Sequence, residues 1–253
     1  MATKVAADLG RFFSEREPSN KSKASVTLDP DRESRLIEQL KSSDSYQVKR
    51  SIRALSPAQS PWLIDTLRQF IIGEDEELAD TSISALREIP GRKSAQVLAT
   101  GLNSRFRGIR SSAAFALGEM ALFGRKEDAE SVIDSLITAA TNLAEELGVL
   151  DEITHGIAKV GGPKAVDALI DIIQSKNMPA ELKAKAIHGP GRFWRSSEFQ
   201  RKPNHSLYAH FVKRAIPVID NWPVSLCEEV INSDIFQYIE GPLRDAVLER
   251  VNK

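Results

Sequence analysis

Residues 107–120 read RGIRSSAAFALGEM, and their apolar side chains follow the spacing of one face of an α-helix. Within this stretch, Ile109 is followed after seven, eight and eleven positions by Ala116, Leu117 and Met120. Two other segments repeat this spacing, with the residues Leu78, Ala85, Leu86 and Ile89, and Val149, Gly156, Ile157 and Val160. A small residue thus returns three times in the same phase, where it lets a neighbouring helix approach closely. Coincidental amphipathic helices would not keep it in phase, so the pattern predicts repeated, closely packed helices.

A second pattern, two adjacent apolar residues with a third three positions on, precedes these segments. It begins at Leu36, Leu63, Val97, Val132 and Leu169, in steps of 27, 34, 35 and 37 residues. Periods of about 30 to 45 residues are typical of stacked helical hairpins. Pro90-Gly91 and Gly161-Gly162-Pro163 stand where one hairpin would end and the next begin. We therefore expect an all-α fold, a right-handed α-α superhelix of about five to seven hairpins.

These motifs resemble a known family. Residues 107–120 resemble the second helix of HEAT repeats, particularly the variety found in phycobilin lyases, and residues 161–170 (GGPKAVDALI) resemble the first helix of that variety. The resemblance covers roughly Asp31 to Ile187 and implies a HEAT-repeat solenoid. It implies little about function, because HEAT repeats serve as scaffolds, lyase subunits, nucleic-acid readers and inhibitors.

The two ends depart from the repeat. Residues 1–28 are polar with scattered apolar positions, which predicts a flexible leader, although Leu9, Phe12 and Phe13 would suit a short docking helix. We expect residues 29–253 to form one solenoid domain. Its predicted parts are regular repeats (31–188), an irregular basic and aromatic insertion (189–205) and capping helices (206–253). Gly189-Pro190-Gly191 is predicted to stop a helix, because proline removes a donor and clashes with the preceding turn.

Composition narrows the classes of function. The 253 residues carry a net charge of −1, which disfavours a dedicated nucleic-acid binder but not a local basic patch. Cys227 is the single cysteine, so internal disulfides and cysteine-based zinc clusters are excluded and a reducing, cytoplasmic location fits. We expect Cys227 to be a small buried apolar residue. A membrane-spanning segment is not expected, because the sequence has no run of about 18 apolar residues.

The insertion is the first candidate site. Arg192, Arg195, Arg201 and Lys202 would meet phosphates or an acidic protein, while Phe193 and Trp194 would stack on bases or anchor a partner. The alternative is that Phe193, Trp194 and Phe199 fix the loop on the solenoid and the charges face water. Such a long irregular segment still favours a functional role.

Basic residues at the start of the third unit are the second candidate. Arg105 and Arg107 are predicted to contact a partner, while the HEAT resemblance implies that Arg110 ties neighbouring turns together. With Arg87, Arg92 and Lys93 they would form a positive ridge over units two and three.

An acidic group is the third candidate. Glu145, Glu146, Asp151, Glu152 and His155 could perform acid–base chemistry or hold a metal, since Asp151 and His155 share a helical face. No second His or third ligand stands at a fixed spacing, so a solvated acidic face is the better interpretation. We expect no metal, no cofactor and no catalytic residue.

These observations favour a non-catalytic scaffold, adaptor or inhibitor that holds another protein on the concave face of the solenoid and on the 189–205 segment. Two alternatives remain open at this stage. One is a phycobilin-lyase-like or chaperone-like subunit, and the other is a nucleic-acid-binding HEAT protein.

Overall fold

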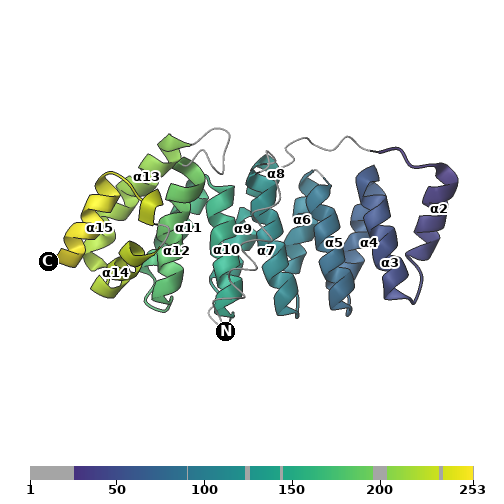
Figure 1. The fold of residues 1–253 in the computed structure, drawn as a ribbon, viewed down its shortest axis with the longest axis horizontal. Coiled ribbons are helices and arrows are strands. Elements are labelled where there is room, and N and C mark those ends of the chain that lie inside the picture. The colour runs from purple at the N-terminus through teal and green to yellow at the C-terminus, as the bar shows by residue number, and fades with distance from the viewer. Residues whose placement is uncertain are drawn as a thin grey trace.

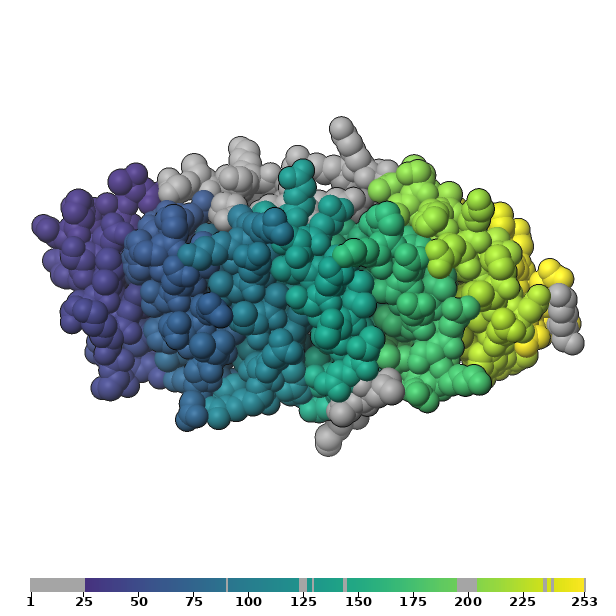
Figure 2. All heavy atoms as spheres, turned by 180° about the vertical axis from the view of Figure 1, so that it is seen from behind, coloured from purple at the N-terminus to yellow at the C-terminus, as the bar shows by residue number. Residues whose placement is uncertain are grey.

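The structure is a computed structural model that describes residues 26–89, 91–122, 126–142, 145–195, 204–233 and 236–252. In these ranges the chain is helical and folds into antiparallel helix pairs that stack in chain order in one row (Figures 1 and 2). The helices are α2 (Pro30–Gln39), α3 (Ser45–Leu55), α4 (Pro61–Ile72), α5 (Glu76–Glu88), α6 (Arg92–Gly101), α7 (Arg107–Leu122), α8 (Lys126–Glu130), α9 (Ile133–Ala140), α10 (Leu147–Val160), α11 (Pro163–Gln174), α12 (Ala180–Pro190), α13 (His205–Ala215), α14 (Val224–Asn232) and α15 (Pro242–Asn252). The all-α helical-repeat solenoid expected from the sequence is confirmed.

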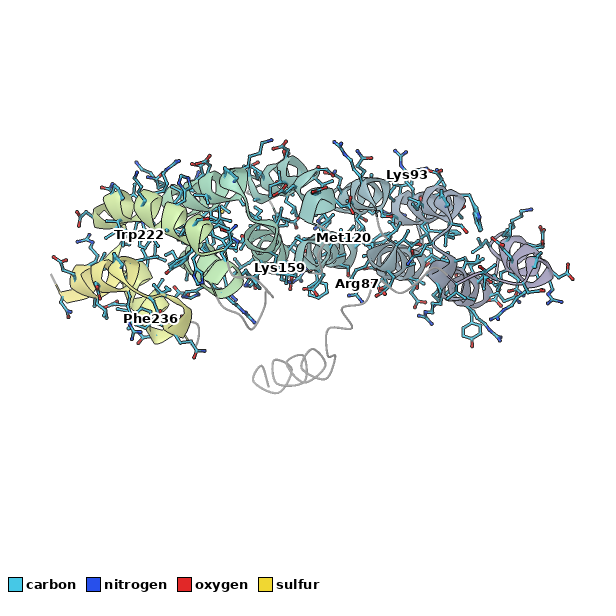
Figure 3. The ribbon with its side chains drawn as sticks, turned by 90° about the horizontal axis from the view of Figure 1, so that it is seen from above. Arg87, Lys93, Met120, Lys159, Trp222 and Phe236 are labelled. Carbon is cyan, nitrogen blue, oxygen red and sulfur yellow. The ribbon has the colours of Figure 1, made fainter. Side chains whose placement is uncertain are left out.

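The pairs define units and layers. First helices (α2, α4, α6, α9, α11, α13) form one layer, and second helices (α3, α5, α7, α10, α12, α14) form the other, with α15 after the last pair. Seen from above, the row is arched, and the second helices lie on its inner, concave side (Figure 3). A solenoid of this kind offers the side chains of its inner layer as one extended surface.

Caps and turns set the helix boundaries. Asp44 and Asp75 accept hydrogen bonds from the backbone N–H groups of Tyr46 (2.9 Å) and Leu78 (3.0 Å), which satisfies free donors at the starts of α3 and α5. Gly161 and Gly162 join α10 to α11 with φ of 69° and 87°, values that a residue with a Cβ rarely adopts. The junction predicted from the glycines is therefore confirmed.

The core fills the space between the layers with aliphatic side chains. Ile109, Ala116, Leu117 and Met120, the residues that revealed the repeat, are all buried. Gly156 lies against α7, where a Cβ on it would stand 3.1 Å from the carbonyl oxygen of Ala114. The small residue in phase thus has the packing role that its position predicted.

Ion pairs connect neighbouring units along the outer layer. Lys93 at the start of α6 reaches Asp65 of α4 (2.6 Å), and Lys164 at the start of α11 reaches Asp134 of α9 (2.7 Å). Each lysine is the second residue of its helix, and each aspartate directly follows the pair of apolar residues that begins the repeated pattern of its unit. These pairs are exposed, so they define the register of the stack more than they stabilise it.

The helix stop predicted at Gly189-Pro190-Gly191 is wrong. Helix α12 continues through Pro190 and passes into a π-helical turn over Gly191–Arg195. Gly189 allows this part of α12 to approach α10, because a Cβ on Gly189 would lie 2.6 Å from that of Ala158. A wider turn accommodates the missing donor of proline. The first part of the predicted irregular insertion is therefore helical, and residues 196–203 lie outside the described residues.

The predicted leader also ends earlier than expected. The backbone N–H of Val26 donates to the carbonyl oxygen of Pro57 (3.0 Å), and Leu28 packs against the core. Leu9, Phe12 and Phe13 lie outside the described residues.

Candidate binding surface

The concave face is formed by the solvent-facing side chains of the second helices α5, α7, α10 and α12. Figure 3 places Arg87 and Lys159 on this inner side and Lys93 on the outer side, with Met120 between the layers. A pocket of about 210 Å³ opens where α5, α7 and α10 meet. Its walls include Asp80, Ser84, Arg87, Ser112, Phe115 and Glu152. The pocket therefore combines an aromatic ring with side chains of both charges.

Polar contacts hold the neighbouring helices of this face in register. Ser112 donates to Asp80 (3.0 Å), which joins α7 to α5. Lys159 donates to Glu119 (2.8 Å), and this pair joins α10 to α7 and is largely shielded from water. The Lys159 ammonium also lies 4.7 Å from the ring centre of Phe115. Beside the pocket, the face is thus a fixed arrangement of an aromatic ring, a cation and a carboxylate.

Asp151, Glu152 and His155 lie on the adjoining part of α10. His155 Nδ1 stands 3.2 Å from Asp151 Oδ1, and Lys185 of α12 lies 3.4 Å from the other oxygen of Asp151. Burial raises the pKa of Asp151, but the contacts to His155 and Lys185 outweigh burial and hold that pKa below its ordinary value. Asp151 and His155 are half-buried and paired, so the expected solvated acidic face is wrong here.

Glu152 differs from its neighbour. Burial raises the pKa of the Glu152 carboxyl, and the positive charges of His155 and Lys159 offset only part of that effect. No ion pair or hydrogen bond of Glu152 is found among the described residues. Glu152 lines the pocket. A cation bound in the pocket would attract the Glu152 carboxylate and so offset the cost of burying its negative charge.

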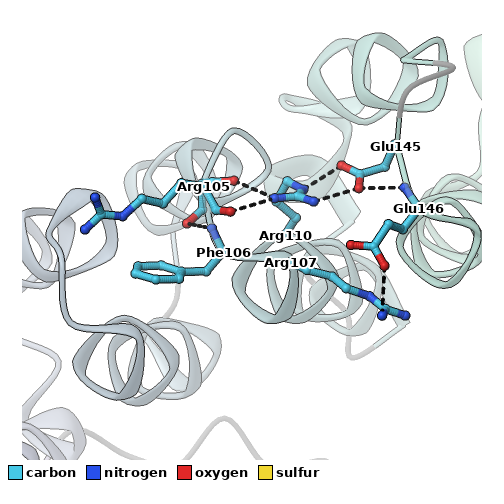
Figure 4. A network of polar contacts seen from close by, with 7 residues as sticks. Arg105, Phe106, Arg107, Arg110, Glu145 and Glu146 are labelled. Atoms are coloured by element: carbon cyan, nitrogen blue, oxygen red, sulfur yellow. Dashed lines mark hydrogen bonds and ion pairs between the residues drawn. The ribbon is translucent and has the colours of Figure 1, made fainter.

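Arg110 lies in the first turn of α7 and forms a closed network (Figure 4). Its guanidinium donates to both oxygens of Glu145 (2.5 and 2.8 Å) and to the carbonyl oxygens of Ser104 (2.9 Å) and Arg105 (3.2 Å). The hydrogen bond to Glu145 raises the pKa of Arg110, and the same bond lowers the pKa of Glu145. Arg110 therefore ties the turns of two units together, as its position implied.

The neighbouring arginines are paired too. Arg107 contacts Glu146 (2.9 Å), and Arg105 contacts Glu74 (3.3 Å), with the side chains of both pairs more than half exposed. Lys93 lies on the outer layer, so the basic residues of units two and three are dispersed over different faces. The predicted positive ridge is therefore wrong, because carboxylates of adjacent units stand beside its members.

The predicted site at 189–205 contains aromatic residues that are buried and charged residues that the structure describes only in part. Phe193 and Trp194 are 3% and 1% exposed, and Trp194 Nε1 donates to the carbonyl oxygen of Ala158 (2.6 Å). The Trp194 ring also meets Phe211 of α13 edge-on, with ring centres 6.1 Å apart. These contacts agree with the alternative interpretation, in which the aromatic residues fix the segment on the solenoid and do not touch a partner.

The charged residues of that segment are described only in part. Arg192 is half-buried, with its guanidinium 5.4 Å from the ring centre of Phe193. The side chain of Arg195 and the whole of Arg201 and Lys202 lie outside the described residues.

Among the described residues there is no group of three or more His, Cys, Asp or Glu side chains that could hold a metal ion. Cys227 is fully buried, as expected, and burial raises the pKa of its thiol. None of the described helices has the length and apolar character needed to cross a membrane.

Sequence reasoning missed the polar row beside the pocket. Glu88, Glu119, Lys159 and Arg192 each come ten positions after the first apolar residue of their repeat. Their charge changes from negative on α5 and α7 to positive on α10 and on the π-helical turn that follows α12. The alignment that revealed the buried positions contained this signal, but only the arched stack shows that the row faces inward.

Comparison with known proteins addresses the fold. No protein-family model matches the chain, and no curated protein matches it. Among solved structures, an engineered protein from a structural genomics consortium is similar over 88% of this chain and 97% of its own, with 18% identity and a TM-score of 0.52.

Two further structures are more distant. A designed armadillo repeat protein in complex with the peptide (KR)4 has 16% identity and a TM-score of 0.49, over 86% of this chain and 98% of its own. The complex of CpcE and CpcF of phycocyanin lyase from Nostoc sp. PCC7120 has 14% identity and a TM-score of 0.37, over 94% of this chain and 97% of its own. At these identities the similarity concerns the fold alone. The chain has the fold of a helical-repeat solenoid.

Proposed function

We propose that this protein is a non-catalytic scaffold or adaptor that binds a segment of another protein on the concave face of its second helices. The observation that carries the proposal is the pocket between α5, α7 and α10, in which Phe115 and Glu152 share the wall. A concave surface with an aromatic anchor point and fixed polar groups suits a protein segment.

The pocket also suggests which side chain it accepts. The Glu152 carboxylate is half-buried, and its raised pKa records the cost of holding a charge there. A lysine or arginine of the partner would supply the missing positive charge, and its methylene groups would pack on Phe115. Further along the face, Arg192 on the continuation of α12 would meet an acidic residue of the same segment.

A protein partner is preferred over nucleic acid. Arg105, Arg107 and Arg110 each lie beside a carboxylate, so binding a phosphate there would require breaking an existing pair. Phosphate neutralisation supplies most of the affinity of nucleic-acid binders, and this arrangement offers little of it. The single cysteine fits a reducing compartment, and we propose a cytoplasmic location.

The proposal is tested by placing a photo-crosslinking amino acid at Ser84, an exposed residue of the pocket wall, and identifying the captured protein segment by mass spectrometry. The dissociation constant of the purified partner is then measured for the wild type, Glu152→Gln, Phe115→Ala and the outer-face control Lys93→Ala. We expect a loss of about tenfold for each pocket variant and none for the control. Unchanged affinity of both pocket variants would show that the concave pocket is not the binding site.

A further inference from the structure

The turns that join the first helix to the second helix of each unit lie along one edge of the stack, the lower edge in Figure 1. This edge carries most of the large apolar side chains that the described residues expose. Those side chains are Tyr46 (69% exposed), Ile72 (58%), Leu147 (39%) and Val224 (39%), while Val26 lies elsewhere. Single exposed apolar residues are ordinary, but they are usually scattered. Here each stands within two residues of a helix boundary at the same type of turn.

Polar contacts join these apolar residues into one continuous edge. Ser45, next to Tyr46, donates to Asp75 (2.5 Å) in the turn that follows Ile72. In that same turn Glu74 pairs with Arg105, whose guanidinium lies 4.8 Å from the ring centre of Phe106.

The third and fourth turns are connected in the same way. Arg107, next to Phe106, pairs with Glu146, which directly precedes Leu147 (Figure 4). Each of these polar contacts joins two adjacent turns through residues that lie next to the apolar side chains in the sequence. The contacts therefore fix the relative positions of the apolar side chains of four successive units. We call the surface defined by Tyr46, Ile72, Phe106 and Leu147 the turn edge.

The charge around the first two turns is negative. Residues 41–49 and 73–77 together contain five carboxylates (Asp44, Glu74, Asp75, Glu76 and Glu77) and two lysines (Lys41 and Lys49). Both lysines pair with glutamates, Lys41 with Glu38 and Lys49 with Glu77. The exposed side chains of Tyr46 and Ile72 are thus bordered by excess negative charge, which complements a partner that carries both apolar and basic side chains.

We propose that the turn edge is a second docking surface, separate from the concave pocket, and that its occupant is a basic amphipathic segment of another protein. Apolar side chains of that segment would cover Tyr46 and Ile72. Its lysine and arginine residues would face the carboxylates of the first two turns. Burial of two large exposed side chains and charge complementarity supply the binding energy together.

The probe is a fluorescein-labelled synthetic peptide of about 18 residues, in which leucine recurs at positions i, i+3, i+4 and i+7 and lysine fills the other positions. The two residue types then form opposite faces of a helix of about five turns. A second peptide carries glutamate in place of every lysine. Binding is followed by fluorescence anisotropy. We expect the lysine peptide to bind and the glutamate peptide not to bind.

Variants then locate the peptide. We expect Tyr46→Ser combined with Ile72→Ser to raise the dissociation constant of the lysine peptide by about tenfold. Glu74→Gln combined with Glu76→Gln should weaken binding and reduce its dependence on salt. The outer-face variant Lys93→Ala should bind as the wild type does. All substituted turn-edge residues are exposed, so circular dichroism and urea unfolding should match the wild type.

Three results would overturn the proposal: equal binding by the Tyr46→Ser, Ile72→Ser variant, equal binding of the glutamate peptide, or a loss of binding confined to Phe115→Ala. Sedimentation velocity distinguishes a second copy of the chain from a basic partner segment as the occupant of the turn edge. If the chain self-associates and Ile72→Ser abolishes the association, the edge serves a second copy of the chain and not a basic partner segment.

Discussion

Gly118 and Gly156 meet where α7 crosses α10: a Cβ atom added to Gly118 would lie 3.1 Å from the Cα of Gly156. These two helices form the centre of the concave face, so their separation determines where Phe115, Glu119 and Lys159 stand. We expect Gly156→Val to lower the free energy of unfolding by about 1–3 kcal/mol, because the added atoms would push α10 away from the backbone of α7.

Urea unfolding followed by circular dichroism measures this effect. Gly108→Ala is the matched control, because a Cβ there meets only the exposed end of Glu76. The control should leave stability unchanged or raise it by up to about 1 kcal/mol through its helix propensity. Wild-type stability of Gly156→Val would contradict the close approach.

Arg110→Ala should lower the free energy of unfolding by about 1.5–3 kcal/mol, because it leaves the Glu145 carboxylate and two carbonyl oxygens without their shared donor. The side chains of this pair are 18% and 6% exposed, so water replaces the lost contact poorly. Arg105→Ala removes an exposed pair and should change stability by less than about 1 kcal/mol. Equal effects of the two substitutions would refute the role of Arg110 as the tie between turns.

His188 predicts a dependence of stability on pH. Burial lowers its pKa to about 4, with Lys185, His155 and Arg192 acting in the same direction and a hydrogen bond from the ring to the Val230 backbone opposing them. The folded state therefore favours the neutral ring. This contribution is complete above the ordinary pKa near 6.5 and is lost as pH falls toward about 4, to a total of at most about 3 kcal/mol.

The measurement compares urea unfolding of the wild type and His188→Gln at pH values across that window. The wild type should lose more stability between about pH 6.5 and 4 than the variant does, since glutamine cannot take up a proton there. Parallel pH profiles would mean that His188 titrates normally in the folded protein.

Trp194→Phe should lower the free energy of unfolding by about 1–3 kcal/mol, because the carbonyl oxygen of Ala158 in the last turn of α10 would lose its donor in a buried place. Trp222→Phe is the matched control. Trp222 is equally buried, but its Nε1 makes no hydrogen bond within the described part of the chain. The control should therefore cost less than Trp194→Phe, and the reverse order would contradict the assigned role of Trp194.

Much of the architecture could be predicted from spacing alone. The phase that relates Ala85, Ala116 and Gly156 identified the second helices, and the glycines at 161 and 162 marked a junction, because helical periodicity and positive φ are local properties. The stop at Gly189-Pro190-Gly191 was predicted by the same local reasoning and was wrong. Packing of Phe193 and Trp194 and the close approach of Gly189 to α10 stabilise a helical path that local preference disfavours.

The candidate sites also differ in whether local sequence or tertiary packing determines them. The sequence by itself determined that this chain forms a stack of helical hairpins and that Arg110 would join neighbouring turns, since both follow from a repeated register. Only the tertiary structure decided which side chains share a surface. It buried Phe193 and Trp194, paired Arg105 and Arg107 with carboxylates, placed Phe115 and Glu152 around one pocket, and aligned Tyr46, Ile72, Phe106 and Leu147 along one edge. The physical reason is that these relationships join residues about one repeat apart, and their distances depend on how adjacent hairpins pack and curve, which the spacing of residues within one helix does not specify.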